Sequence, residues 1–267
     1  MPPYALFSDD SPNLDGSIFR SARASSREIM IPVFLFGIDR RTVNQLKRQL
    51  FQALNPARGY CVLTFTEGDG RSRKLSCYYK GGMEGAEDSS TAGFTWAKYG
   101  LTFTAMDPWF YSDRDESKRW DFGAGDPFLS PVTSFFPVKI SSGVLGGDGQ
   151  GLAINNPGDI EAWPVWELRG PIKSFSLTSP YGESIAAAPP SDGSDLVASG
   201  RRLIIDTRPG RKTVKDSTGT NYWDRLSSNP QFWSIDPGES SADISVVTGS
   251  GKAAVTLSFS PRYASYV

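Results

Sequence analysis

The sequence predicts a mainly β protein of two domains: an α+β first domain with one helix, and a second domain that is a β-sandwich. Glycine and proline are plentiful, with 27 and 19 residues, and aromatic residues make up 12% of the chain. Frequent turns and many aromatic side chains favour β-structure, because these side chains suit a half-buried pleated surface. After about residue 135, short strand candidates recur between turns without a helical period, which is typical of a sandwich.

The predicted domain boundary lies between residues 134 and 135. A strongly charged segment, residues 113–121, is followed by a stretch with many prolines and glycines. Such composition is typical of a junction between folded parts of a chain. The predicted domains are therefore 1–134 and 135–267.

The start of the chain predicts an arm followed by an edge strand. Residues 1–28 show no clear periodicity and are interpreted as an extended arm or loop in which short strands can form. Residues 29–37, IMIPVFLFG, are an apolar β run that ends at Gly37. Pro32 cannot donate a hydrogen bond to a strand ladder, so this strand is predicted to lie at a sheet edge or to contain a bulge.

One amphipathic helix is predicted over residues 39–55. Asp39 is one candidate for its N-cap, and Thr42, which forms a capping-box pattern with Gln45, is the other. Asn55-Pro56 ends the helix, because the residue before proline disfavours the α region. We expect its apolar stripe to pack on the sheet of its own domain and its basic face to be solvated. The stripe consists of Val43, Leu46, Leu50, Phe51 and Leu54.

Two alternating segments, 61–66 and 71–79, flank a glycine-rich turn and predict a β-hairpin. If the hairpin turns symmetrically about Asp69, Cys61 and Cys77 lie directly across from each other. Residues 1–10 lack the features of a signal peptide, so we expect synthesis in a cytoplasm and reduced thiols.

Residues 94–111 predict one long strand with a bulge at Gly100.

Composition excludes several kinds of catalytic site. The chain contains no histidine, which removes the commonest general base and metal ligand and excludes Ser-His-Asp and Cys-His systems. Two cysteines alone cannot complete a zinc site. The carboxylates in 113–121 lack the calcium-loop pattern, alternate with basic residues and are interpreted as a self-neutralising surface loop. We assign no catalytic, cofactor-binding or metal-binding residue and expect no cofactor.

Charge and hydropathy argue against two classes of partner. The net charge is −1, whereas a dedicated nucleic-acid binder needs a basic surplus to neutralise phosphates. No apolar run approaches the ~20 residues needed to cross a bilayer. We therefore expect neither stoichiometric nucleic-acid binding nor membrane insertion. Most of the seven tryptophans are expected in the core or in interfaces rather than in a sugar-stacking platform.

The order of these segments resembles the distal tail proteins of long-tailed phages, the siphophage-type tail components. The resemblance covers nearly the whole chain from about residue 27, and it depends on order and spacing rather than on one sharp motif. One departure follows Pro237-Gly238, where similar proteins often have asparagine and this chain has serine. The carrying segments are IMIPVFLFG, the helix with LNPARG, RKLSCYYKGGME, LTFTAMDPWFYS, INNPGDIEAWPVWELRGP, RRLIIDTRPGRKTV, FWSIDPGES and VTLSFSPRY.

The resemblance implies a structural virion protein and not an enzyme. It implies a ring-forming N-terminal belt domain, usually in a hexamer, and a galectin-like C-terminal sandwich that projects outward. The ring would join the end of the tail tube to tail-tip and receptor-binding proteins and leave a channel through which DNA passes. Galectin-like describes shape and does not imply lectin activity.

Two functions of other classes stay open. In the first, the protein is a carbohydrate-binding module whose second domain contacts the host surface. In the second, it is a hydrolase of cell-wall sugars that uses a pair of carboxylates, which needs no histidine.

Overall fold

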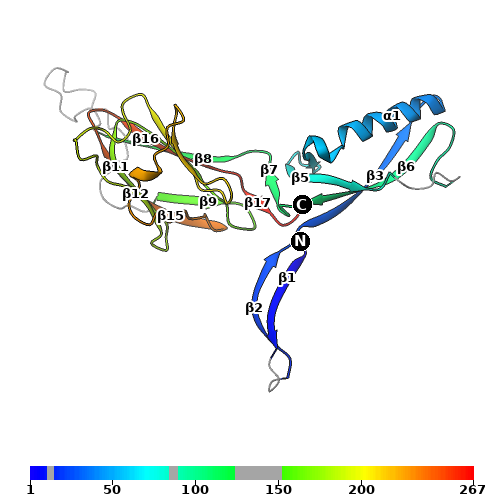
Figure 1. Cartoon of the computed structure of the whole chain (residues 1–267), viewed down its shortest axis with the longest axis horizontal. Helices are drawn as coiled ribbons and strands as arrows, with labels where there is room; N and C mark the ends of the chain where they lie inside the picture. The colour runs from blue at the N-terminus through cyan, green and yellow to red at the C-terminus, as the bar shows by residue number, and fades with distance from the viewer. Residues whose placement is uncertain (11–14, 84–89, 124–151) are drawn as a thin grey trace. The chain divides into compact units, whose positions relative to one another are not determined.

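The computed structural model describes residues 1–10, 15–83, 90–123 and 152–267. These residues form two compact units, of which the first is Met1–Asp113 with Tyr263–Val267 and the second is Arg114–Arg262. The predicted boundary between residues 134 and 135 lies outside the described residues. Both units are built mainly from antiparallel strands, which confirms the predicted fold class (Figure 1).

The first unit is built on a six-stranded antiparallel sheet in the order β17-β7-β5-β6-β3, with β4 paired to β5. Strand β3 lies at one edge and pairs with β6 along its whole length. The edge position predicted from Pro32 is therefore confirmed. The strands are β3 (Arg27–Phe36), β4 (Cys61–Thr66), β5 (Ser72–Gly81), β6 (Trp96–Ala105), β7 (Phe110–Ser112) and β17 (Arg262–Tyr263).

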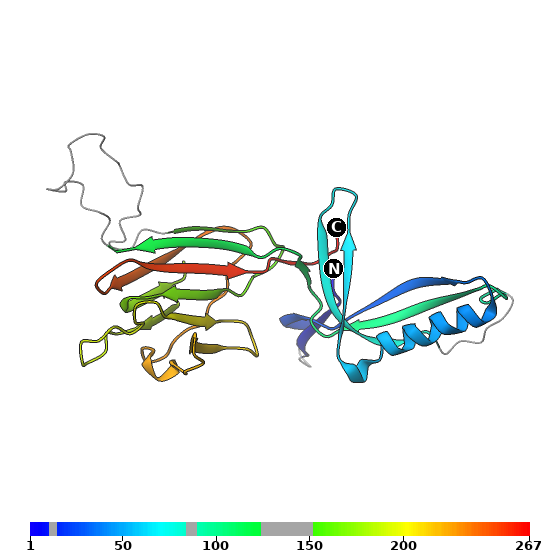
Figure 2. The same ribbon diagram turned by 90° about the horizontal axis from the view of Figure 1, so that it is seen from above.

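Helix α1 (Arg40–Ala53) lies along one face of this sheet, beside β3 and β6, and a short 3₁₀ helix, η1 (Pro56–Arg58), follows it (Figure 2). The carboxylate of Asp39 accepts a hydrogen bond of 2.7 Å from the backbone N–H of Thr42. Asp39 is therefore the N-cap, and it satisfies a backbone donor that the first helical turn leaves without a partner.

The apolar stripe of α1 faces the sheet except at one position. Val43 is almost completely buried, and Leu46, Leu50 and Leu54 are half-buried. Phe51, the fifth residue of the predicted stripe, is 45% exposed. At about 100° per residue, it is rotated about 80° from Val43, whereas Leu50 and Leu54 lie close to the direction of Val43. The prediction that Phe51 packs on the sheet is wrong.

Strands β1 (Tyr4–Asp10) and β2 (Ser17–Ala24) form a two-stranded antiparallel hairpin apart from the six-stranded sheet. We call this hairpin the arm. It extends away from the sheet of the first unit (Figure 1). The prediction of an extended arm is confirmed, and the register of its two strands shifts once, between Phe7 and Ser8.

Strands β4 and β5 pair in the register predicted from the turn, with Cys61 opposite Cys77. The predicted bulge at Gly100 is wrong, because the β3–β6 pairing runs without a shift through Gly100, opposite Pro32. The register shift lies in β5 instead, between Tyr79 and Gly81.

Gly82 lies so close to the backbone at Gly100 that only a glycine fits there. Gly82 has a φ of +111°, and a Cβ there would meet the carbonyl oxygen of Gly100 at 2.0 Å. The long predicted strand 94–111 is also divided, because β6 ends at Ala105, just before Asp107-Pro108, and β7 begins at Phe110.

The second unit is a sandwich of two antiparallel sheets, as predicted. One sheet has the order β14-β13-β10-β16-β8 and the other has the order β12-β11-β15-β9. A 3₁₀ helix, η2 (Trp223–Arg225), follows β14. The strands are β8 (Glu116–Phe122), β9 (Leu152–Asn156), β10 (Val165–Arg169), β11 (Ile172–Thr178), β12 (Ser184–Ala187), β13 (Arg202–Asp206), β14 (Thr213–Asp216), β15 (Gly238–Thr248) and β16 (Ala253–Phe259).

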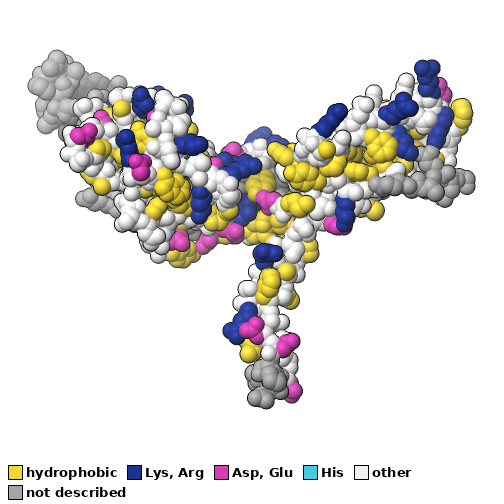
Figure 3. Space-filling model, viewed as in Figure 1, with side chains coloured by type: hydrophobic (Ala, Val, Ile, Leu, Met, Phe, Trp, Pro, Cys, Tyr) yellow, Lys and Arg dark blue, Asp and Glu magenta, His cyan; other side chains and the backbone are white. Residues whose placement is uncertain are grey.

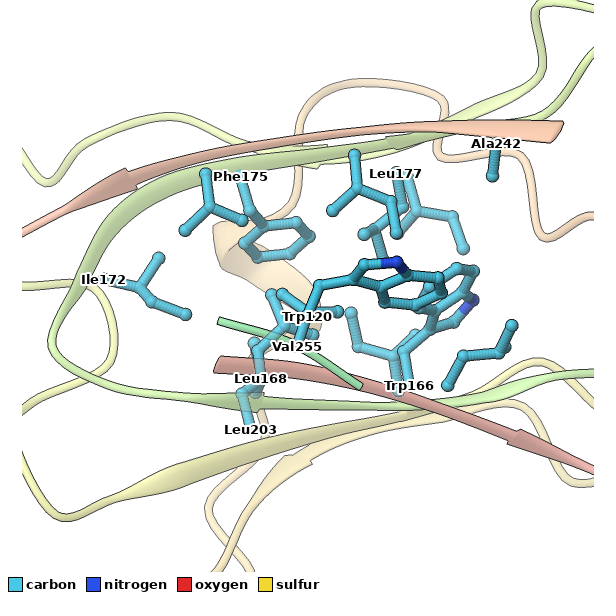
Figure 4. Packing of buried hydrophobic residues seen from close by; sticks show 14 of the residues in the cluster. Trp120, Trp166, Leu168, Ile172, Phe175, Leu177, Leu203, Ala242 and Val255 are labelled. Atoms are coloured by element: carbon cyan, nitrogen blue, oxygen red, sulfur yellow. The ribbon is translucent and has the colours of Figure 1, made fainter. Parts of the chain in front are cut away.

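The core of the second unit is centred on Trp166, which has no exposed surface (Figure 4). Its ring centroid lies 6.4 Å from that of Trp120 and 5.5 Å from that of Trp233. Aliphatic side chains from both sheets surround the three rings. The expectation that most tryptophans serve packing holds for these three.

The predicted surface loop at residues 113–121 is wrong, because most of it is strand β8, which pairs with β16. Trp120 and Phe122 point into the core, while the charged residues between and before them point outward. Arg119 and Asp121 form an exposed ion pair of 2.8 Å on that outer side. Charges on alternate positions are compatible with a strand that has one buried face.

Candidate functional site

The carboxylates of the segment 113–121 are divided between the two units. Asp113 belongs to the first unit, whereas Asp115, Glu116 and Asp121 belong to the second. Asp115 accepts a hydrogen bond from the hydroxyl of Ser260. Within the part of the chain that the structure describes, no group of three or more His, Cys, Asp or Glu side chains is arranged to hold a metal ion. No helix in that part is long and apolar enough to cross a membrane.

Asp216 is the most strongly perturbed carboxylate of the second unit, and its role is structural. Its Oδ1 accepts hydrogen bonds from the Thr218 hydroxyl at 2.6 Å and from the backbone N–H groups of Thr218 and Thr220 at 2.9 Å. Arg201 donates to its other oxygen at 3.0 Å. The bond from the Thr218 hydroxyl, followed by these others, lowers the pKa of Asp216 to about 2. The carboxylate thereby stabilises the turn after β14.

The outward-facing aromatic side chains of the second unit do not form an open platform at Trp223. This ring is partly exposed but stacks on Phe232, with centroids 5.0 Å apart and an angle of 12° between the planes. Lys212 lies over the ring of Phe232, with Nζ 5.4 Å from the centroid. One face of Trp223 is therefore already covered by its own chain.

The sheet face opposite α1 carries exposed apolar side chains of the first unit. Side chains alternate along β3, so that Ile29, Ile31, Val33 and Leu35 pack towards the core. The side chains between them point away from the helix. Of these, Met30, Phe34 and Phe36 are 68%, 55% and 65% exposed.

Aromatic and basic side chains of β6 extend this surface. The rings of Phe34 and Trp96 stack with centroids 6.0 Å apart, and Nζ of Lys98 lies 5.4 Å from the Trp96 centroid and 5.9 Å from that of Phe34. We call Met30, Phe34, Phe36, Trp96 and Lys98 the open face. Clustered exposed apolar side chains beside a free sheet edge are typical of a protein–protein interface.

The arm carries a second apolar surface. Tyr4 and Leu6 point to one side of β1, and Phe19 of β2 lies on that same side, because it pairs with Ser8. All three are at least 47% exposed. Towards the tip the arm is charged, with Arg20 and Asp9 joined by an ion pair of 2.6 Å (Figure 3).

The arm lacks the packing that normally stabilises a hairpin. In the described part of the chain its side chains are exposed or, at Ala5 and Ala24, half-exposed. A two-stranded hairpin alone is marginally stable in water. The arm is therefore a segment that gains stability when it packs on another surface.

Sequence reasoning assigned no site residues and did not identify the open face. The run IMIPVFLFG is apolar at nearly every position, so it is typical of a strand buried on both faces. The available signal was Pro32, which already indicated an edge strand. An edge strand that is apolar on both sides predicts one side covered by its own domain and the other by a partner.

One protein family matches part of the first unit. Residues 8–91 match the family described as the phage tail protein RIFT-related domain. This range includes most of the arm, the edge strand β3, helix α1 and the β4–β5 hairpin. No curated protein matches the chain by sequence.

A solved structure of a phage protein has a similar fold. This is the crystal structure of SPP1 Dit (gp 19.1), which is described as a paradigm of the hub adsorption apparatus in phages that infect Gram-positive bacteria. It has a TM-score of 0.69 and 12% identity, and the match covers 98% of this chain and 89% of that chain. Two structures of the phage P2 baseplate in its activated conformation also match. The structure with Ca has a TM-score of 0.49 and 9% identity, and the match covers 97% of this chain and 86% of that chain. The structure with Sr has a TM-score of 0.45 and 10% identity, and the match covers 96% of this chain and 89% of that chain.

These findings identify the fold. The chain has the fold of a phage distal tail protein, as in SPP1 Dit, and residues 8–91 of its first unit match the phage tail protein RIFT-related domain. The resemblance in fold that the sequence predicted is confirmed.

Proposed function

We propose that the protein forms a closed ring of six copies at the distal end of the tail tube. In this proposal the first unit, the counterpart of the predicted domain 1–134, is the ring-forming belt. The second unit, the counterpart of the predicted domain 135–267, is a galectin-like sandwich outside the channel. The ring is a hub that joins the tube to tail-tip and receptor-binding proteins and lets DNA pass through its centre. The likeness in fold to SPP1 Dit, which is described as a hub, supports this role.

The observation that carries the proposal is the uncovered apolar surface of the first unit. A closed ring needs two different complementary surfaces on each copy, because its interfaces join head to tail. The open face with the free edge of β3 is one such surface, and the arm is the other. Strand β3 has 10 residues and the arm strands have 7 and 8, so their lengths are comparable.

The proposed contact is addition of the arm of one copy to the edge of β3 in the next. Backbone hydrogen bonds give such strand addition its affinity, and alternate side chains give it specificity. The apolar side of the arm, with Tyr4, Leu6 and Phe19, then has a place to be buried against the open face. Pro32 leaves one ladder position without a donor, which limits uncontrolled pairing along this edge.

Sedimentation velocity over a concentration series tests this contact. We expect the wild-type chain to associate towards the mass of the ring, and Phe34→Glu to shift the distribution to monomers, because it introduces a charge into an apolar interface. Phe51→Glu is the matched control, since Phe51 is also exposed but lies on the helix. Equal distributions for the wild type and Phe34→Glu, or equal disruption by Phe51→Glu, would refute the contact.

A further inference from the structure

The first unit contains a hollow at the base of the arm, beside the start of β3. Its volume is about 680 Å³, and every residue that lines it belongs to the first unit. Phe65, Phe110 and Tyr266 form aromatic walls. Ser26 and Ser265 add hydroxyl groups, and Arg27 adds a guanidinium.

Arg27 begins strand β3 and is more than nine-tenths buried, at 8% exposure. Its guanidinium lies over the ring of Phe110, with Cζ 4.8 Å from the centroid, and its Nη2 donates one hydrogen bond of 2.7 Å to the carbonyl oxygen of Ala264. Its Nε is buried and has no hydrogen-bond partner in the described part of the chain. Among the described residues, no carboxylate lies within ion-pair distance of this group.

A second arginine, Arg73, contacts the same C-terminal segment and has hydrogen-bond partners there. Arg73 donates hydrogen bonds of 2.7 Å to the carbonyl oxygens of both Ser265 and Val267, and it lies 3.8 Å over the ring of Tyr263. The neighbour of Arg27 in sequence is also satisfied, because Glu28 pairs with Lys80 on the outward side of β3. Of Arg27, Arg73 and the Glu28–Lys80 pair, only Arg27 is a buried charge that has a polar atom without a partner in the described part of the chain.

A buried cation without a counter-charge is costly, and a guanidinium binds a carboxylate with two parallel hydrogen bonds. Burial lowers the pKa of Arg27 from its ordinary value, but an arginine still stays protonated at neutral pH. One positive charge matches one carboxylate rather than a phosphate dianion. The aromatic walls suit an apolar group next to that carboxylate.

We propose that this hollow is a binding site for an acidic side chain of another polypeptide, held by Arg27, with an adjacent apolar residue against Phe65, Phe110 and Tyr266. A polypeptide is favoured over a small free acid, because two apolar side chains that line the hollow, Met1 and Tyr266, are 91% and 49% exposed. A bound chain would cover them, whereas a small acid would leave them in water. The site does not depend on ring closure, so either proposal can fail without the other.

The test is a nuclear magnetic resonance titration of the full chain with two matched peptides, Ac-Phe-Glu-NH₂ and Ac-Phe-Gln-NH₂. The Nε–Hε resonance of Arg27 and the amide resonances of Ser26 and Ser265 report on the hollow. We expect saturable shifts with the glutamyl peptide and at least about tenfold weaker binding of the glutaminyl peptide, since only the former carries the counter-charge.

Two variants separate binding from folding. Arg27→Met removes the charge, and Ser26→Phe fills the hollow while keeping the charge; both should abolish the shifts of the amide resonances. If Arg27→Met fails to fold, Ser26→Phe still decides. Equal affinity for the two peptides, or no saturable shift up to the solubility limit of the glutamyl peptide, would overturn the proposal. Tighter binding of 3-phenylpropionate than of the glutamyl peptide would overturn the assignment to a polypeptide.

Discussion

Cys61 and Cys77 lie directly opposite each other in the β4–β5 ladder, with Sγ atoms 3.5 Å apart. Burial raises the pKa of Cys77 to about 12, and the contact with Cys61 adds to this effect. Because the thiolate is the reactive form, Cys77 should react slowly at neutral pH.

We predict that both thiols are reduced in the native protein and that iodoacetamide modifies the half-buried Cys61 before the buried Cys77. Timed alkylation followed by peptide mass spectrometry measures the order. A native mass that is lower by two hydrogen atoms would show a disulfide instead. Faster labelling of Cys77 would contradict the effect of burial.

Helix α1 should depend on its sheet-facing side for stability. Val43→Ala removes two methyl groups from a fully buried position and should lower the free energy of unfolding by roughly 2 kcal/mol. Arg48 is exposed on the same helix, so Arg48→Ala should cost less than about 0.5 kcal/mol. Urea denaturation of both variants checks this. Similar losses for the two would mean that Val43 does not face the core.

The reasons why some elements were predictable lie in local chemistry. The edge position of β3 follows from Pro32, the start of α1 from Asp39, and the pairing of Cys61 with Cys77 from the turn centred on Asp69. Each of these depends on the backbone limits or hydrogen bonds of residues close in sequence.

The elements that sequence reasoning missed depend on the tertiary environment. The charged sequence of β8 is typical of a loop. It forms a strand because it pairs with β16 and buries Trp120 and Phe122 in the core. Residues 231–236, which are among the short strand candidates after residue 135, form no regular strand. They are held mainly by burial of Trp233 and Ile235, with one bridge to Ala162. The open face was missed for a related reason, because hydropathy alone cannot show which side of an apolar strand its own domain covers.

The two central tryptophans of the sandwich should respond differently to loss of the indole N–H. Nε1 of Trp233 donates a hydrogen bond of 3.1 Å to the carbonyl oxygen of Leu177, whereas Nε1 of Trp166 is buried and has no partner among the residues that the structure describes. Trp233→Phe loses a hydrogen bond worth about 1 kcal/mol, and Trp166→Phe removes an unsatisfied donor.

We therefore predict that Trp233→Phe destabilises the chain more than Trp166→Phe, although Trp166 is the more buried ring. Both substitutions remove the same atoms, so each serves as the control for the other. Thermal unfolding followed by calorimetry measures the difference. The opposite order would mean that packing around Trp166 outweighs the hydrogen-bond effect.

Asp216 should make the second unit sensitive to acid. Its pKa of about 2 in the folded protein lies below the ordinary value of 3.8. Its stabilising contribution is therefore complete above the ordinary value and is lost as the pH falls towards 2. The stability advantage of the wild type over Asp216→Asn should shrink over this range.

Thermal unfolding at a series of pH values between about 5 and 2 measures this advantage. Asp121→Asn is the control, because Asp121 pairs with Arg119 in the solvent and should contribute little at any pH. A difference between the wild type and Asp216→Asn that stays constant with pH would show that the charge of Asp216 is not what stabilises the turn.

The most direct test of ring formation is an electron cryo-microscopy map of the assembled tail tip. We expect six copies of the chain related by rotation about the tail axis. The open face and the arm of each first unit should be buried against neighbouring copies, and the second units should lie outside the channel. A tail tip in which the chain is monomeric, in which Phe34 and Phe36 face solvent, or in which the sandwich lines the channel would contradict the proposal.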